Sequence, residues 1–135
     1  MLSTSEDLGK LVLRLCVGIL LLFHGIAKLG TGIGPIEAMM AARGMPVFFA
    51  WGVYIGEIIA PTLLILGIYA RLGALLAMAN MLVAIALAHT AHLLILGNSG
   101  GWRLELQGLF LFGSLAIVLL GAGRFSIGGK MGRWN

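Results

Sequence analysis

The chain has 135 residues, of which 60% are hydrophobic and only 10% are charged. A soluble domain of this length is nearer half apolar and a quarter charged, so the composition excludes an ordinary soluble globular domain. The formal net charge is +4. The basic residues are scattered at the ends of apolar runs, which is typical of membrane topology signals and not of a nucleic-acid-binding surface. We therefore predict an integral membrane protein of one domain that binds no nucleic acid.

The apolar runs predict four membrane-spanning helices, because each run has about the 20 residues needed to cross a bilayer. The predicted spans cover about residues 8–29, 47–68, 72–96 and 104–120, and a polar tail over residues 121–135 is expected to be partly mobile. Short connections force neighbouring spans to run antiparallel, so the predicted fold is all-α, an up-down four-helix bundle. Residues 35–43 predict a short interfacial helix between the first two spans.

Glu57 is the only charged side chain of the second predicted span. A charge at the centre of a membrane helix costs about 2.5–3.5 kcal/mol on insertion scales, so such residues usually face the bundle interior and have a partner. Lys28, His24 and Arg14 of the first span are the candidate partners. Pro61 removes a backbone donor and is expected to loosen the helix beside Glu57.

The first predicted span carries one polar stripe, and the third carries two histidines on one side. The stripe consists of Arg14, Gly18, Leu21, Gly25 and Lys28, with His24 beside it. Its small residues permit close approach of another helix. His89 and His92 are three residues apart, which places them on the same side of a helix.

Counting lysine and arginine residues predicts that both termini are cytoplasmic. One side of the membrane would hold Lys10, Arg14, Arg71, Arg124, Lys130 and Arg133, whereas the other would hold Lys28, Arg43 and Arg103. The polar residues of the outer half would then be His24, Lys28, Glu57, His89, His92, Trp102, Arg103 and Glu105.

An ordered set of short motifs covers nearly the whole chain. The set comprises Arg14-Leu-x-x-Gly18, Phe23-His24-Gly25 with Lys28-Leu29, Gly44-x-Pro46, Glu57, Leu63-Leu-x-Leu-Gly67 with Arg71, His89, Glu105-Leu106, and Gly121-x-Gly123-Arg124-Phe125-Ser126. In this order the motifs resemble the DoxX family of small four-span bacterial membrane proteins. The chain departs from the family pattern at Ala122, where proline is usual, and at Gly128, where aspartate is usual.

The resemblance implies a multi-pass protein of the bacterial inner membrane that is linked to redox systems. The founding members of the family are small subunits of a thiosulfate:quinone oxidoreductase, and relatives are tied to membrane thiol and oxidative-stress systems. The main hypothesis is therefore a membrane subunit linked to such a system, with a quinone as candidate ligand. Whether the chain is itself an enzyme stays open. It has no nucleotide loop, flavin fingerprint or CxxC motif, so the redox centre would belong to a bound cofactor or a partner chain.

A quinone site needs a hydrogen-bond donor for a carbonyl, a carboxylate that handles protons, and an apolar cavity. Glu57 and His24 are the candidate catalytic residues. The candidate ligand-binding residues are Lys28, His89, His92, Phe23 and Trp51. Arg14, Arg103 and Glu105 are the candidate structural ion-pairing residues, and docking of a partner is the alternative role for the exposed pair Arg103 and Glu105.

Two other functions remain open, namely a non-catalytic anchor or assembly partner and a small-solute or proton transporter. The anchor would use Glu57 only in a buried ion pair, and four short spans would need to form a homo-oligomer to make a transport pathway. The three histidines raise a metal site as an alternative, but one pair plus a distant third is weak support, so no metal is predicted. The single cysteine, Cys16, is interpreted as a packing residue.

Overall fold

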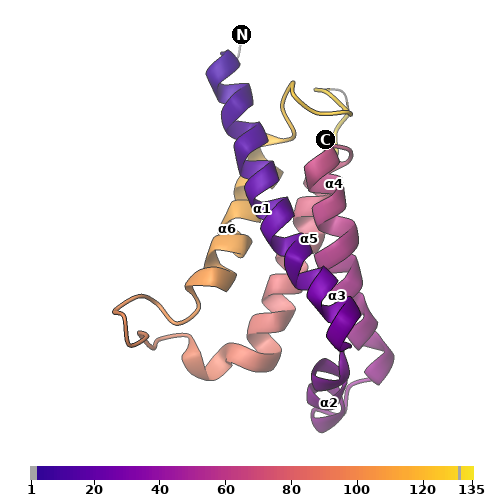
Figure 1. Cartoon of the computed structure of the whole chain (residues 1–135), viewed down its shortest axis with the longest axis vertical. Coiled ribbons are helices and arrows are strands. Elements are labelled where there is room, and N and C mark those ends of the chain that lie inside the picture. The colour runs from indigo at the N-terminus through magenta and orange to yellow at the C-terminus, as the bar shows by residue number, and fades with distance from the viewer. Residues whose placement is uncertain (1–2, 131) are drawn as a thin grey trace.

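The computed structural model describes residues 3–130 and 132–135 (Figure 1), and this part of the chain is helical, without strands. The helical elements are α1 (Thr4–Thr31), α2 (Gly34–Ala42), the 3-10 segment η1 (Val47–Trp51), α3 (Gly52–Tyr54), the π-helical segment η2 (Ile55–Ile59), α4 (Ala60–Leu66), α5 (Ala70–Ala84), the π-helical segment η3 (Ile85–His89), the 3-10 segment η4 (Thr90–His92) and α6 (Glu105–Leu120). The only pairing of β type among these residues is an isolated bridge between Leu96 and Trp102.

Three continuous helical stretches of the described residues are long and apolar enough to cross a membrane, namely Thr4–Thr31, Val47–Leu66 and Ala70–His92. α6 is also apolar but has only 16 residues. Its length of about 24 Å is less than the hydrocarbon thickness of about 30 Å. The predicted all-α class is confirmed, together with three membrane-capable helices, whereas the four-span up-down bundle stays a prediction. The third stretch ends at His92, before the expected limit of the predicted span.

The predicted stripe of α1 is its buried face. The buried residues of α1 are Asp7, Arg14, Val17, Gly18, Leu21 and Gly25. Gly18 lies against α4, where an added Cβ would come 2.8 Å from Ile65. Gly25 lies so close to the backbone carbonyl of Glu57 that an added Cβ would collide with it. The glycines therefore set how closely α1 approaches the helix that carries Glu57.

The helix around Glu57 changes its hydrogen-bond pattern because of Pro61. Proline has no N–H, so the Glu57 carbonyl, four residues earlier, lacks its α-helical donor. In η2 the chain winds more widely, and the Ala60 N–H donates to the carbonyl of Ile55. Such π-helical turns inside α-helices are frequent at functional sites. The local loosening that Pro61 predicts is thus present, and Gly25 covers the freed carbonyl.

The tail (residues 121–130 and 132–135) folds back onto the ends of α1, α4 and α5, at the end of the molecule where the N-terminus also lies (Figure 1). Backbone hydrogen bonds fasten it: Ile127 N–H to the Leu66 carbonyl (3.1 Å), Gly128 N–H to the Gly67 carbonyl (3.0 Å) and Arg71 N–H to the Trp134 carbonyl (2.9 Å). These contacts satisfy groups at the ends of α4 and α5 that have no partner within their own helix. The structure therefore gives the tail defined contacts where a partly mobile segment was expected.

Arg14 is fully buried and is bound by backbone carbonyls. Its guanidinium donates to the carbonyls of Leu64 (2.7 Å), Ile65 (3.4 Å), Ala122 (3.1 Å) and Phe125 (2.6 Å). No ion pair within the described residues involves it. Arg14 therefore has backbone carbonyls as partners where the sequence predicts an ion pair. Arg14 lies about 21 Å along α1 from Lys28, the residue that pairs with Glu57. Arg14 is therefore too far from Glu57 to pair with it, and carbonyls of the tail bind its guanidinium instead.

Replacing Arg14 by lysine should destabilise the protein by about 2–3 kcal/mol. Lysine keeps the charge but cannot reproduce the planar fork of five donors that binds several carbonyls at once. Thermal unfolding in detergent measures the effect, with Arg103→Lys, at an exposed position, as the matched control. Equal unfolding temperatures for the Arg14→Lys and control variants would contradict this role.

Gly25→Ala should destabilise the protein by at least about 1–3 kcal/mol, because the methyl group of the alanine would displace the backbone of η2. Gly9→Ala is the control in the same helix, since nothing lies within 4 Å of a Cβ built there. Unfolding in detergent should show a loss for Gly25→Ala and no loss for Gly9→Ala. A neutral Gly25→Ala would mean that α1 is not in close contact with η2.

Candidate functional site

A cavity of about 350 Å³ lies between α2, the segment from η1 to η2, and the segment from α5 to η3. Its apolar walls consist of Ile36, Met39, Met40, Phe49, Ala50, Val53, Ile55, Leu76, Ala79, Val83, Ala84, Leu87 and Ala88, with Gly52 and Gly56. Its three polar side chains are Lys28, Glu57 and Asn80. A mostly apolar cavity of this size with a few convergent polar groups is typical of small-molecule binding sites.

Three elements supply the polar side chains of the cavity. Glu57 comes from η2 and its side chain is only 7% exposed. Its Oε2 forms an ion pair with the Nζ of Lys28 from α1, and its Oε1 accepts a hydrogen bond of 3.1 Å from the Asn80 amide of α5. Among the candidate partners of Glu57, the structure therefore selects Lys28. Charged groups buried away from water are usually paired in this way.

Asn80 is the site residue that the sequence analysis does not assign. The signal available was an amide side chain in a long run without formal charge. Asn80 reaches Glu57 because the preceding residue, Gly56, has no side chain. A Cβ added at Gly56 would overlap the Asn80 side chain. The Tyr54 hydroxyl donates to the Lys28 carbonyl over 3.2 Å and so holds the end of α1 near the same site.

The hydrogen-bonding capacity of the site is unevenly distributed. Both oxygens of Glu57 already accept hydrogen bonds. The ammonium group of Lys28 carries three N–H donors, and Glu57 is its only hydrogen-bond acceptor among the described residues. The side chain of Lys28 is 27% exposed and lines the cavity. The free N–H donors of Lys28 can therefore bind a ligand that carries a hydrogen-bond acceptor. The formal charges of Lys28 and Glu57 cancel, so this ligand can be neutral.

Arg43 connects the end of α2 to the opposite wall of the cavity. Its Nη1 donates to the carbonyl of Ala86 in η3 over 2.6 Å. In a π-helical segment the hydrogen bonds shift by one residue, which leaves carbonyls that an outside donor can use. This contact holds the connector between α1 and η1 against the end of α5.

The structure does not bring His24 to Glu57. His24 is exposed on α1, and its ring packs edge-on against Phe110 of α6 with 5.6 Å between ring centroids. One residue on an α-helix turns the side chain by about 100°. The buried face passes through Gly25, so His24 points toward α6 and away from η2. The proposed joint role of His24 and Glu57 finds no support in this geometry.

The predicted aromatic ligand contacts lie outside the cavity. Phe23 is 62% exposed on the surface of α1. Trp51 is 60% exposed and its ring packs at a tilt of 58° against Tyr54, with 5.7 Å between centroids. Neither lines the cavity, although Ala50 and Gly52, the neighbours of Trp51, do so.

The histidines of the third stretch lie together, next to α6. The rings of His89 and His92 are 6.0 Å apart between centroids, and the Nε2 of His89 lies 3.3 Å from the amide nitrogen of Gln107. Neither lines the cavity, which ends at Leu87 and Ala88. Within residues 3–130 and 132–135, no three His, Cys, Asp or Glu side chains form a group that would hold a metal ion.

Arg103 and Glu105, interpreted as an ion pair, are both exposed and not paired with each other. Three ion pairs connect the described side chains: Lys28 with Glu57, Arg124 with Asp7, and Lys130 with Asp7. Glu105 lies instead beside Gly101, where an added Cβ would come 2.5 Å from its carboxylate. Solvation of both charges explains the absence of a direct contact, because an exposed pair contributes little.

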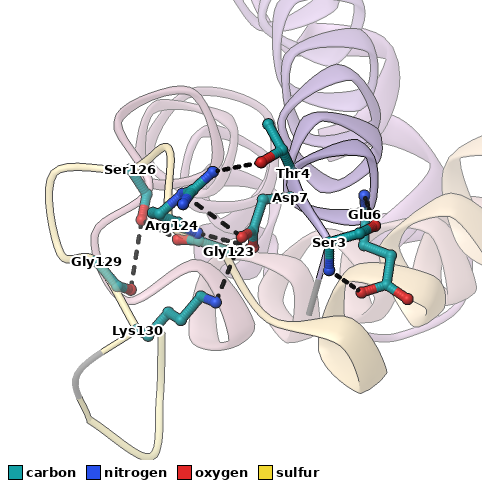
Figure 2. A network of polar contacts seen from close by, with 9 residues as sticks. All are labelled: Ser3, Thr4, Glu6, Asp7, Gly123, Arg124, Ser126, Gly129 and Lys130. Carbon is teal, nitrogen blue, oxygen red and sulfur yellow. Dashed lines mark hydrogen bonds and ion pairs between the residues drawn. The ribbon is translucent and has the colours of Figure 1, made fainter. Parts of the chain in front are cut away.

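Asp7 forms a second buried polar site, at the end of the molecule that carries the tail (Figure 2). Its Oδ1 accepts a hydrogen bond of 3.1 Å from the Arg124 backbone N–H. Its Oδ2 lies 3.3 Å from the Lys130 Nζ and 3.7 Å from the Arg124 Nε. Arg124 also donates to the hydroxyl of Thr4 over 3.1 Å. The sequence analysis assigns no role to this carboxylate, which fastens the tail to α1.

Comparison with protein families gives one match, to DoxX, over residues 9–90. Comparisons with curated proteins and with solved structures gave no match. The matched segment contains Lys28, Glu57 and Asn80, and it covers more than half of the chain. The chain is therefore a membrane protein of the DoxX family.

Proposed function

We propose that the protein is a quinone-binding membrane subunit of a redox system, either a quinone-dependent oxidoreductase or a thiol and oxidative-stress system. The observation that carries the proposal is the apolar cavity that ends at the Lys28 ammonium, beside Glu57 and Asn80. The association of the DoxX family with membrane redox contexts supports the same class of function. The redox centre itself would belong to a partner chain or a bound cofactor.

The chemistry of a quinone suits this cavity. A quinone head is neutral and apolar apart from its carbonyl oxygens, which accept hydrogen bonds. Lys28 would donate to one carbonyl, and the neighbouring carboxylate would compensate the charge of Lys28. The rim residues Phe49, Ile55 and Val83 are about half exposed. An isoprenoid tail would therefore leave the cavity between these side chains into the bilayer.

Glu57 would transfer protons to or from the quinone oxygens and would not bind the quinone ring directly. Its carboxylate receives both of its hydrogen bonds from Lys28 and Asn80, so its place in the site is fixed. When a partner chain changes the redox state of the quinone, protons must move to or from the quinone oxygens. The Lys28–Glu57 pair is the only protonatable pair that lines the cavity within the described residues. His24 has no part in this proposal because it faces α6.

We also propose that both termini are cytoplasmic and that the membrane is the bacterial inner membrane. The two ends of the described chain lie at one end of the molecule (Figure 1), as do the residues with the larger share of lysine and arginine. The cavity would then lie in the outer half of the membrane. A non-catalytic anchor is the second candidate function, since the Lys28–Glu57–Asn80 contacts also connect three helical elements.

Lys28→Met should raise the Kd for a short-tailed ubiquinone analogue roughly 10–100-fold, because it removes a charged hydrogen-bond donor. Quenching of Trp51 fluorescence in detergent measures binding. His24→Ala is the control and should bind with unchanged affinity.

Ala84→Phe provides a second arm of that experiment, since it fills the cavity without touching the polar groups. It should abolish binding while the protein stays folded by circular dichroism. Full affinity in both the Lys28→Met and Ala84→Phe variants would sink the proposed site.

Glu57→Gln keeps the size of the side chain but removes its charge and replaces one of its two acceptor oxygens by an NH2 donor. In membranes that contain the native redox system, we expect quinone-linked electron transfer to fall at least tenfold, as loss of a proton-transfer group usually causes. Glu105→Gln, at an exposed position, should leave the rate unchanged. If Glu57→Gln lowers only the unfolding temperature and not the rate, the protein is an anchor.

A further inference from the structure

The net charge of the protein is concentrated at the end that carries the tail. The residues around the tail are the basic Lys10, Arg14, Arg71, Arg124, Lys130 and Arg133 and the acidic Glu6 and Asp7, as their contacts and chain neighbours show. The opposite end holds Lys28, Arg43 and Arg103 with Glu37, Glu57 and Glu105, whose formal charges cancel. The whole formal net charge of +4 therefore lies at the tail end.

The tail holds its cations in a defined place. Asp7 binds the backbone of Arg124 and lies beside the side chains of both Arg124 and Lys130, as Figure 2 shows. One carboxylate cannot compensate two cations, so positive charge remains there. The side chains of two further cations, Lys10 and Arg133, form no hydrogen bond or ion pair with residues that the structure describes.

The tail also exposes apolar side chains close to its basic residues. Ile127 is 71% exposed, Trp134 is 48% exposed and Phe125 is 37% exposed. The backbones of Ile127 and Trp134 are nevertheless fixed by hydrogen bonds to Leu66 and Arg71. These side chains are thus held outward, and tryptophan is enriched at the boundary between bilayer and water.

The length of α1 places this surface at that boundary. A helix of 28 residues is about 42 Å long, whereas the hydrocarbon layer is about 30 Å thick. The first turns of α1, which hold Asp7 and Lys10, therefore reach the headgroup region. The tail lies beside these turns.

We propose that the tail is a binding surface for anionic phospholipid headgroups. Lys10 and Arg133 would contact the lipid phosphates, together with the uncompensated charge beside Asp7. Trp134 and Ile127 would insert between the headgroups. Anionic lipid is the partner because the surface combines excess positive charge with outward apolar side chains at the depth of the headgroups. This inference does not depend on the quinone site.

The experiment compares phosphatidylglycerol with phosphatidylcholine. Both lipids are added to the detergent-solubilised full-length protein, and native mass spectrometry counts the lipids that stay bound. Phosphatidylglycerol should be retained about 25-fold better, which is about fivefold for each of the two charges Lys10 and Arg133. The preference should fall about fivefold for each charge removed in Lys10→Gln and Arg133→Gln. Arg103→Gln, at an exposed position outside the tail, should keep the full preference.

Insertion of the tail is measured in nanodiscs with Trp134 as the only tryptophan, in a Trp51→Phe and Trp102→Phe background. Brominated phosphatidylglycerol should quench Trp134 more strongly than brominated phosphatidylcholine, and Lys10→Gln with Arg133→Gln should remove the difference. Equal quenching by both lipids, or an unchanged preference in the double variant with a normal unfolding temperature, would overturn the proposal. Binding of a protein partner to the tail in place of lipid would appear as loss of quenching when that partner is added.

Discussion

The two charges that are buried within the apolar helices, Glu57 and Arg14, need partners inside the chain, and the packing of the helices depends on that constraint. The structure meets it in two ways. Glu57 receives an ammonium and an amide, from α1 and α5. Arg14 receives four backbone carbonyls, from α4 and the tail. The two sites lie at different levels of α1, so this single helix is fastened to its neighbours near both ends, and the elements that supply the partners are drawn around it.

Irregular backbone makes the first of these sites usable. The missing donor of Pro61 widens the helix at η2, and the glycines at positions 25 and 56 let α1 and Asn80 approach it closely. A regular helix with larger side chains at those positions would keep the partners apart. The second irregular segment, η3, exposes the Ala86 carbonyl to Arg43. The cavity lies between these two segments, so departures from α-helical geometry shape both of its walls.

Much of this could be predicted from the sequence, because periodicity and charge are local properties. The all-α class, the buried stripe of α1 and Lys28 as a candidate partner of Glu57 follow from apolar runs, helical spacing and the cost of a lone charge in lipid. His24 neighbours the stripe by one residue, and that rotation along the helix is enough to place its ring against Phe110 of α6. Sequence patterns do not show backbone carbonyls, so the partners of Arg14 could not be identified from the sequence. Asn80 and the tail depend on contacts between distant segments, which no local pattern encodes.

The carbonyl partners of Arg14 have a consequence for biosynthesis. Two of them, Ala122 and Phe125, lie 108 and 111 residues later in the chain. At ordinary translation rates this separation corresponds to roughly 5–20 s of synthesis. During that interval α1 has been synthesised, whereas two of the four carbonyl partners of the Arg14 guanidinium have not. The final packing of α1 therefore requires that Ala122 and Phe125 have been synthesised.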